Sequence, residues 1–330
     1  MKIDIYTHMM PPKYLAALRK KVSSGFSLLE MIDATPALWD LDIRFKIMDK
    51  HSDIRQVLTF AIPPVEAVSD PREAADLARR GNDDMAEIVA KHPDRFAAGV
   101  AMLAMNNMDE ALKETDRAIN DLGLKGVQVS TNVNGKPLDL PEFMPLYEKM
   151  AGHGLPIWIH PRRDETVPDY ETESSSKYRI NAALGWPFET QVAMARLVFS
   201  GVLEKYPNLK FITHHCGGGI PFFTERIKEF SRHRGDPGRE THLAGLSRAP
   251  IEYFRMFYND TAVTGFTPAL MCGYALFGAE HILFGTDMPF GREQGAPSIE
   301  ETLQAIEEMS ITGPEKQMIL GGNAMKLLRL

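Results

Sequence analysis

The sequence predicts an α/β fold in which eight parallel strands, each followed by a helix, close into a (β/α)8 barrel of the TIM type. Short apolar runs alternate with longer stretches of helical periodicity along the chain, which is typical of repeated βα units. Polar residues, several of them histidines, follow the apolar runs at the positions where barrel enzymes place their active sites. Because one barrel routinely uses this much sequence, we expect residues 1–330 to form a single domain.

Eight apolar runs are the candidate strands, and most of them end in Gly, Pro or polar residues. In chain order they are residues 2–6, 56–61, 97–103, 126–130, 156–160, 209–214, 254–260 and 281–286. Their number matches the strand count of a closed barrel.

Amphipathic stretches between these runs are the candidate outer helices, because their charged residues group on one face. They are residues 70–91, 109–122, 142–153, 188–205 and 298–309. Two longer segments, 19–46 and 162–186, fit this alternation poorly. We interpret them as inserted loops and helices over the barrel mouth, since long loops in compact domains are commonly functional.

Composition excludes several classes of protein. The formal net charge is −7 and no Lys/Arg-rich run stands out, which argues against a nucleic-acid partner. No segment approaches the roughly 20 consecutive apolar residues of a membrane helix, and the N-terminus enters a strand pattern directly. Cys216 and Cys272 lie far apart, without the spacing of a metal site or a disulfide framework. We therefore expect a cytoplasmic protein without a membrane partner.

Four polar residues follow candidate strands and form a possible catalytic constellation. His8 follows the first strand, His160 ends the fifth, His215 follows the sixth and Asp287 follows the eighth. Imidazole nitrogens and a carboxylate suit zinc, manganese, iron or cobalt, and fewer than four protein ligands leave a position for water or substrate. One such histidine alone is more often structural, so the prediction of a divalent-metal site depends on the joint pattern.

The adjacent pair His214 and His215 requires a choice. Neighbouring residues in a strand point to opposite faces, so at most one of the two can readily face the barrel centre. We assign that position to His215.

Five sequence motifs resemble those of the amidohydrolase superfamily, in the branch that contains aminocarboxymuconate semialdehyde decarboxylase and the resorcylate-type decarboxylases. The resemblance covers nearly the full length. It implies a metal-dependent-hydrolase type of barrel, with His8, His160 and Asp287 at metal-ligand positions and His215 at the position of the catalytic histidine. The motifs are IDIYTHMMP at 3–11, IHP at 159–161, GWPFET at 185–190, HCGGGIP at 215–221 and FGTDMPF at 284–290.

The first motif departs from the family pattern at Tyr6. That pattern is usually H-x-H, sometimes E-x-H, and here it is Tyr-x-His. A phenol has an ordinary pKa of about 10 and is a poor ligand while neutral. Three alternatives stay open: Tyr6 is a metal-bound phenolate, it is a hydrogen-bond donor around a weaker site, or no metal binds. The expected cofactor is one divalent ion, zinc or manganese.

Six further residues on loops near these motifs are candidates for substrate contacts. The two guanidinium groups after His160 suit a substrate carboxylate, with a solvated pair as the alternative. The aromatic residues suit a planar substrate, with ordinary packing or a surface loop as the alternative. The candidates are Arg162, Arg163, Trp186, Phe188, Phe290 and Arg292.

The resemblance implies a metal-dependent non-oxidative decarboxylase, a C–C lyase acting on a small planar aromatic or dienoic carboxylic acid. Asp287 or His215 would then deliver the proton that replaces CO₂. One alternative is a hydrolase or hydratase with metal-bound water as nucleophile and His215 as base. A second alternative, suggested by Tyr6, is a non-catalytic barrel that binds small acids. The resemblance also implies a homodimer.

Overall fold

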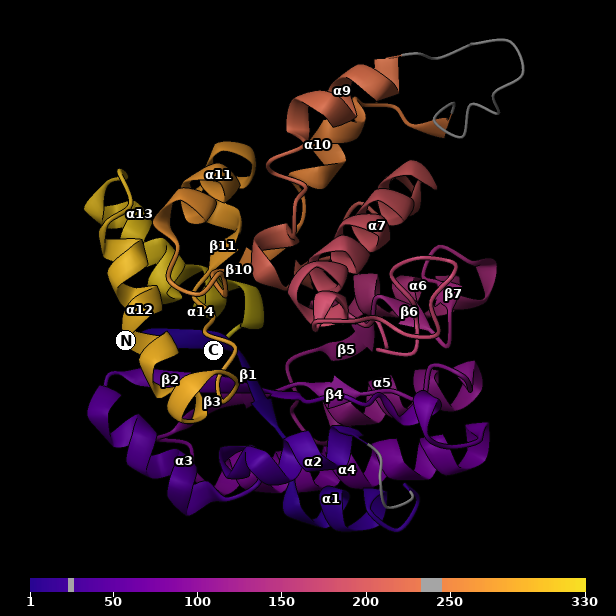
Figure 1. The fold of residues 1–330 in the computed structure, drawn as a ribbon, viewed down its shortest axis with the longest axis vertical. Coiled ribbons are helices and arrows are strands. Elements are labelled where there is room, and N and C mark those ends of the chain that lie inside the picture. The colour runs from indigo at the N-terminus through magenta and orange to yellow at the C-terminus, as the bar shows by residue number, and fades with distance from the viewer. Residues whose placement is uncertain (23–26, 233–244) are drawn as a thin grey trace.

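Eight parallel strands form the centre of the computed structural model, which describes residues 1–22, 27–232 and 245–330 (Figure 1). The third strand is interrupted at Val100, so it consists of two pieces, β3 and β4. The bounds are β1 (Lys2–Met9), β2 (Ile54–Phe60), β3 (Phe96–Gly99), β4 (Ala101–Met102), β5 (Val127–Ser130), β8 (Ile157–His160), β9 (Phe211–Thr213), β10 (Tyr258–Asp260) and β11 (Ile282–Leu283).

Hydrogen bonds between the first and last strands close these elements into a barrel. One sheet has the order β1-β2-β3 and the other the order β11-β10-β9-β8-β5-β4, and every pairing in them is parallel. The amide of Ile5 donates to the Phe284 carbonyl at 2.8 Å, and the amide of Asp287 donates to the Tyr6 carbonyl at 3.1 Å. The predicted (β/α)8 barrel is therefore confirmed.

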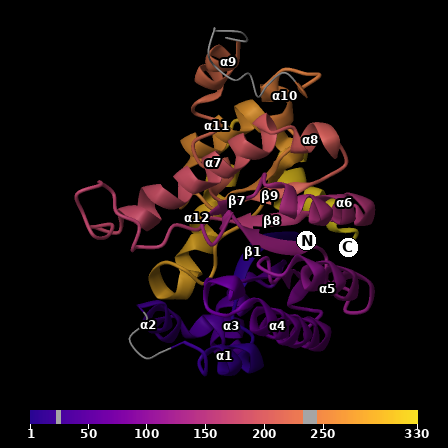
Figure 2. The same cartoon turned by 90° about the vertical axis from the view of Figure 1, so that its right-hand side faces the viewer.

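Helices surround the strands on the outside of the barrel (Figures 1 and 2). A short hairpin, β6 (Asn132–Val133) with β7 (Lys136–Pro137), follows β5. The helices are α1 (Pro12–Leu18), α2 (Ser27–Ala34), α3 (Leu41–Met48), α4 (Pro71–Lys91), α5 (Met108–Asn120), α6 (Met144–His153), α7 (Trp186–Phe199), α8 (Val202–Lys205), α9 (Thr224–Arg232), α10 (Pro250–Phe254), α11 (Thr267–Phe277), α12 (Ala296–Glu307), α13 (Gly313–Gln317) and α14 (Asn323–Leu328).

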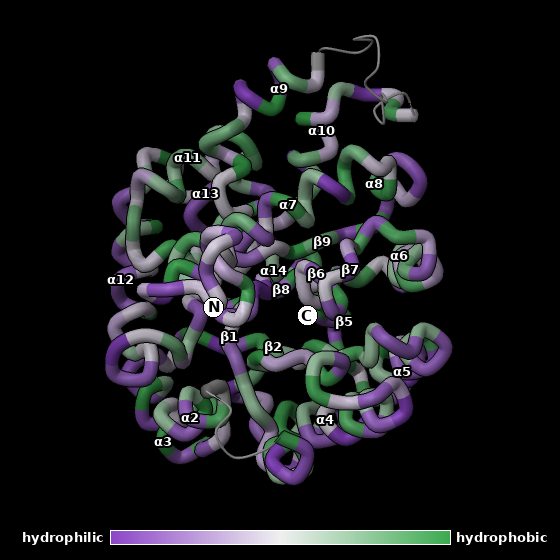
Figure 3. The backbone as a smooth tube through the Cα atoms, turned by 45° about the vertical axis from the view of Figure 1, so that its right-hand side comes forward, coloured by the Kyte–Doolittle hydropathy of each residue, from purple (hydrophilic) through white to green (hydrophobic). Residues whose placement is uncertain are grey.

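The longest helix, α4, illustrates how local sequence produces the outer layer. The Asp70 side chain caps its N-terminus by accepting from two backbone amides at 2.9 Å, and Pro71 occupies the first turn. Its buried residues include Leu77 and Met85, while charged residues lie on the other face. Hydrophobic and hydrophilic segments accordingly alternate along the outer helices (Figure 3).

Apolar side chains fill the amino end of the barrel. Ile3, Val57 and Trp158 are buried there in one cluster. Leu327 and Leu328 of α14 join this cluster and cover that end. The carboxyl ends of the strands are therefore the end at which polar side chains can gather.

Three details differ from the sequence-based expectation. The helix expected over 188–205 is two helices, α7 and α8, separated at Gly201, whose φ of 81° is left-handed. The strand expected over 254–260 begins only at Tyr258, because Phe254 ends α10. Segment 19–46 is only partly an insertion, since Ala37 and Leu38 are buried in the core and α3 begins within the segment at Leu41.

The second long segment, residues 162–186, follows β8 and contains a single π-helical turn, Asn181–Gly185, before α7. Helix α9 projects away from the barrel in both views (Figures 1 and 2), whereas α10 buries Ile251 and Phe254 in the core. Among the described residues, no helix has the length and apolar character that crossing a membrane requires.

Candidate active site

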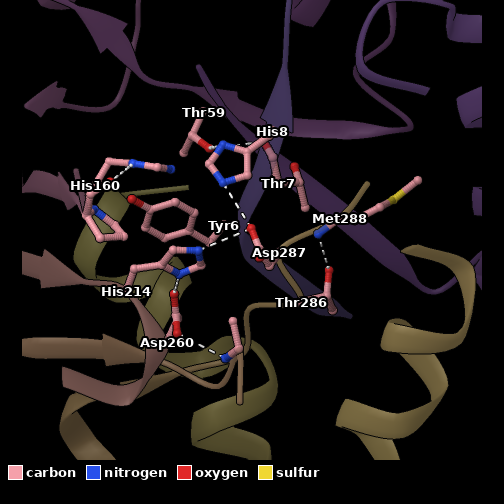
Figure 4. Close-up of polar contacts among 12 residues, drawn as sticks. Tyr6, Thr7, His8, Thr59, His160, His214, Asp260, Thr286, Asp287 and Met288 are labelled. Atoms are coloured by element: carbon pink, nitrogen blue, oxygen red, sulfur yellow. Dashed lines mark hydrogen bonds and ion pairs between the residues drawn. The ribbon is translucent and has the colours of Figure 1, made fainter. Parts of the chain in front are cut away.

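Three side chains meet at the carboxyl end of the barrel. His8 comes from β1, His214 directly follows β9, and Asp287 follows β11 (Figure 4). One ligand atom from each lies within 4.8 Å of the others. Asp287 Oδ1 is 3.1 Å from His8 Nε2 and 3.2 Å from His214 Nε2.

The His8 ring is oriented by its second nitrogen. Nδ1 lies 3.1 Å from the Phe60 carbonyl and 3.3 Å from Thr59 Oγ1, both on β2. Nε2 is therefore turned toward the cluster, where it is buried and faces Asp287 Oδ1. A histidine whose outer nitrogen is held by a carbonyl while the other faces a cluster has the arrangement of a metal ligand.

Asp287 is ionised in this environment. Burial raises the pKa of its carboxyl group, but the charge and hydrogen bond of His214 and the proximity of His8 outweigh burial and hold the pKa well below its ordinary value. Its backbone adopts a left-handed conformation with φ of 63°. This conformation follows the end of β11 and turns the carboxylate into the cluster.

His214 is the largest correction to the sequence-based prediction, which left it facing away from the centre. Its Nδ1 is hydrogen-bonded to Asp260 at the end of β10, while Nε2 contacts Asp287. Burial lowers the pKa of the imidazole, but the charges of Asp260 and Asp287 and the hydrogen bonds to both raise it to about 10. His214 is therefore a buried imidazolium between two carboxylates.

His215 also faces the cluster, so the expectation that only one histidine of the pair would do so is wrong. Strand β9 ends at Thr213, and His215 has a left-handed φ of 55°, which breaks the alternation of an extended strand. The His215 ring stacks on His214 at 3.8 Å, and its Nε2 lies 4.0 Å from Asp287 Oδ2. Burial, followed by the charge of His214, lowers the pKa of His215 to about 4, so this imidazole is neutral.

His160 lies beside the three-residue cluster. Its ring centroid is 5.1 Å from that of His8, and its Nδ1 is 2.7 Å from the Pro161 carbonyl. Burial, followed by the neighbouring His8 and His214, lowers the pKa of His160 well below its ordinary value. The side chain is therefore neutral, as a metal ligand must be.

Tyr6 lies within the same group of side chains. Its ring stacks on His214 at a centroid distance of 3.9 Å, and its buried hydroxyl has no hydrogen-bond partner among the described residues. Burial, followed by the charges of Asp260 and Asp287, raises the pKa of the phenol well above its ordinary value. Tyr6 is thus a neutral phenol next to the metal-type cluster.

The two arginines expected to clamp a substrate are engaged elsewhere. Arg162 contacts Asn134 at 3.2 Å and Asp164 at 3.0 Å, and Arg163 contacts Glu189 at 3.3 Å. Both line a cavity of about 460 Å³ whose lining residues do not include the clustered histidines or Asp287. The two guanidinium groups therefore hold the loop after β8 in place and are not directed at the cluster.

The four remaining candidates divide into two groups. The Trp186 ring lies 6.4 Å from His160, and the Phe290 ring lies 5.2 Å from His8, so both border the cluster. Phe188 is 54 % exposed. Arg292 has a 75 % exposed side chain that pairs with Glu301, so it is a surface residue.

Sequence reasoning missed Asp260, which orients and charges His214. The available signal was its position as the last residue of a predicted strand, the same position that identified His160. Its carboxylate also accepts hydrogen bonds from the amides of Cys216 and Ala262. Asp260 is therefore fixed at the base of the site by three donors.

The donor set fits a divalent metal ion. Two imidazoles and one carboxylate converge, and a third imidazole lies adjacent, with His8 Nε2 3.1 Å from Asp287 Oδ1. His214 would have to release its proton before it could act as a ligand. Nitrogen and oxygen donors of this kind bind zinc, manganese and related ions, and they discriminate weakly among them.

Comparison with known proteins agrees with this geometry. A family model described as amidohydrolase matches residues 3–330. A 2-amino-3-carboxymuconate-6-semialdehyde decarboxylase of Dictyostelium discoideum is 31 % identical over 345 residues, covering 100 % of this chain and 92 % of the relative. A gamma-resorcylate decarboxylase of Rhizobium sp. is 32 % identical over 296 residues, covering 88 % and 87 %.

Solved structures show the same likeness. A 2,6-dihydroxybenzoate decarboxylase from Rhizobium superposes with a TM-score of 0.81 at 29 % identity, covering 99 % of this chain and 98 % of the other. A dihydroxybenzoic acid decarboxylase from Polaromonas, with bound manganese and 2-nitroresorcinol, has a TM-score of 0.79 at 29 % identity and covers 100 % and 97 %.

Proposed function

The chain belongs to the amidohydrolase family, and from this premise we propose that it is a metal-dependent, non-oxidative decarboxylase of a small planar aromatic or dienoic carboxylic acid. The observation that carries the proposal is the buried cluster of His8, His214 and Asp287 at the carboxyl end of the barrel. The decarboxylases that resemble the chain over most of its length support the same reaction. We take residues 1–330 as one catalytic domain.

One divalent ion, manganese or zinc, is the cofactor in this proposal. His8, His160 and Asp287 would hold it, with Tyr6 and the protonated His214 beside them. When bound, such an ion supplies positive charge that holds the substrate carboxylate and a neighbouring oxygen. The manganese in the Polaromonas decarboxylase supports this choice of metal.

The proton that replaces CO₂ on the substrate carbon is assigned to Asp287 and its neighbours. Asp287 is ionised, but its Oδ1 lies 3.2 Å from the protonated His214, which can return a proton to it. Neutral His215 lies 4.0 Å from the other carboxylate oxygen. Protonation of the ring carbon by Asp287, followed by C–C cleavage, releases CO₂ and restores conjugation.

Hydrolysis or hydration is the second candidate. The neutral His215 beside Asp287 is the observation that favours it, because an unprotonated imidazole can take a proton from an attacking water.

Product analysis on manganese-loaded protein distinguishes the candidates. The enzyme is incubated with 2,6-dihydroxybenzoate, 5-carboxyvanillate and related acids in H₂¹⁸O. Release of CO₂ without ¹⁸O in the organic product supports the decarboxylase, whereas ¹⁸O in the product supports the hydrolase. Loss of turnover in Asp287→Asn and His215→Ala, but not in the surface variant Glu142→Gln, would attribute it to this site. Binding without any turnover would support the remaining alternative, a non-catalytic barrel that binds small acids.

We also propose that the protein is a homodimer. Exposed aromatic residues next to and within α9 support an interface there, since Phe222 is 78 % exposed and Phe230 is 63 % exposed. Sedimentation velocity of the wild type and of Phe222→Asp tests it. A monomer in the wild type would overturn the proposal.

A cytoplasmic location completes the proposal. Cys216 and Cys272 are both free thiols, which suits a reducing compartment. Fractionation of the source cells, with detection of the protein by antibody, tests this location.

A further inference from the structure

A small polar recess lies at the carboxyl ends of β2, β4 and β5, next to the histidine cluster. Its volume is about 20 Å³, which is the space that one water molecule or one small substituent requires. Its walls include Phe60, Glu66, Gln128 and Ser130, together with Met102. The recess therefore opens among residues from three barrel strands and the loop after β2.

Glu66 is the unusual member of this wall. Only 4 % of the residue is exposed, and its Oε2 has no hydrogen-bond partner among the described residues. Burial raises the pKa of the carboxyl group to about 7, while a hydrogen bond from its own backbone amide, the charge of Arg162 and a hydrogen bond from the Met105 amide lower it in part. A buried carboxyl oxygen without a partner is costly, so the arrangement favours a ligand group that can donate to it.

The recess shares its walls with the metal-type cluster. The Phe60 carbonyl accepts from His8 Nδ1 at 3.1 Å and from Gln128 Nε2 at 2.9 Å. Gln128 Oε1 accepts from the Phe60 amide at 3.1 Å, so both ends of this side chain are already engaged. Ser130 pairs in register with His160 on β8.

These contacts leave Glu66 Oε2 as a buried oxygen without a partner among the described residues, in a recess that borders His8 through Phe60. The ring of an acid held through its carboxylate at the cluster would have to turn toward β2 and β4 to place a substituent in this recess.

We propose that Glu66 is a specificity-determining residue, which accepts a hydrogen bond from a hydroxyl or amino substituent on the ring of the acid bound at the cluster. This inference rests on the proposed function for the carboxylic acid, and it adds which substituent the site selects. A site with a buried acceptor discriminates against an analogue that lacks the donor, because the acceptor then stays buried and unpartnered.

The test is a binding panel that requires no turnover. Dissociation constants are measured by titration calorimetry on manganese-loaded protein for benzoate, for 2-, 3- and 4-hydroxybenzoate, for 2,6-dihydroxybenzoate and for 3-aminobenzoate. The proteins are wild type, Glu66→Gln, Glu66→Met and, as the matched surface control, Glu142→Gln. Thermal unfolding confirms that each variant is folded, and Glu66→Gln alone decides the outcome if Glu66→Met does not fold.

We expect at least one substituted acid to bind the wild type about tenfold or more tightly than benzoate does. Glu66→Met should abolish that preference, Glu66→Gln should reduce it, and benzoate should bind all four proteins equally. An unchanged preference in the Glu66 variants would overturn the inference and leave the recess to an ordered water. Equal weakening of every acid would also overturn it, as would failure of every acid to bind.

The result is separable from the proposed reaction. A Glu66-dependent preference without CO₂ release would retain the recess and reject the decarboxylase. CO₂ release with a preference that does not depend on Glu66 would support the decarboxylase and reject the role of Glu66.

Discussion

Replacing Tyr6 by phenylalanine tests the most unusual residue of the site, because the change removes only a hydroxyl. Among the residues that the structure describes, that hydroxyl is buried without a partner, while the ring stacks on His214 at 3.9 Å with an angle of 6° between the planes. Leaving a buried polar group unsatisfied costs about 1–3 kcal/mol, so metal-free Tyr6→Phe should be as stable as the wild type or about 1 kcal/mol more stable. In a chain of 330 residues, 1 kcal/mol corresponds to a Tm increase of about 1–2 °C.

The response to metal separates the alternatives for Tyr6. An ion at a hundred times its Kd stabilises the folded state by about 2.7 kcal/mol. We expect Tyr6→Phe to retain this stabilisation, because His8, His214 and Asp287 converge without the phenol and the phenol is neutral.

Scanning calorimetry with and without manganese, and elemental mass spectrometry of the same samples, are the measurements. Tyr14→Phe is the matched control, because Tyr14 is also fully buried but contacts Met102 through its hydroxyl, outside the cluster. Loss of the metal-induced Tm shift in Tyr6→Phe alone would make Tyr6 a metal ligand and refute the reasoning. A marked destabilisation of the metal-free variant would show that the hydroxyl has a partner after all.

Three further predictions concern buried groups around the site. Burial raises the pKa of Asp4 to about 7, so its contribution to stability is fully present below its unfolded pKa of 3.8 and is lost as pH rises through 7. Between pH 5 and pH 7, the free energy of unfolding of the wild type, measured by urea unfolding, should therefore fall by about 2 kcal/mol relative to that of Asp4→Asn. If the free energies of the two proteins change with pH in parallel, the prediction is wrong. The substitution Asp260→Asn breaks the buried ion pair with His214 and should destabilise the metal-free protein by about 3–5 kcal/mol. It should also lower the pKa of His214, which an NMR titration measures. An unchanged pKa would show that Asp260 does not keep the His214 ring protonated. The substitution Gly273→Ala places a methyl carbon 2.3 Å from Cys216 Sγ and should lower the free energy of unfolding by about 1–3 kcal/mol. The double variant Gly273→Ala/Cys216→Ala should regain this stability. If it does not, the methyl group clashes with another atom.

Much of the barrel was predictable because strand periodicity is local. All eight predicted runs overlap an observed barrel strand, and the last residues of several runs identified His160 and the neighbourhood of Asp287. The errors lie where local preference and tertiary packing compete. The apolar run at 254–260 could form a helix or a strand; α10, packed in the core, extends to Phe254, and the strand begins only at Tyr258.

The substrate candidates show the limit of reasoning from residue type. Arg162 and Arg163 have the chemistry to bind a carboxylate, yet Asn134, Asp164 and Glu189 engage both. Those partners lie 2 to 28 residues away in sequence, and their pairing depends on how the loop after β8 folds.

The sequence by itself determined the barrel, the family and the residue types of the site, because strand patterns and motifs are written in short stretches of chain. Only the tertiary structure decided which histidines face one another. The left-handed backbone at His215 brings both members of the pair to the cluster, and Asp260, 46 residues away on the next strand, holds and charges His214. It also decided that Glu66 Oε2 is buried near the site without a partner among the described residues, since that depends on the closing of β2, β4 and β5 around it. Side-chain partners across strands arise from barrel closure, which no local pattern encodes.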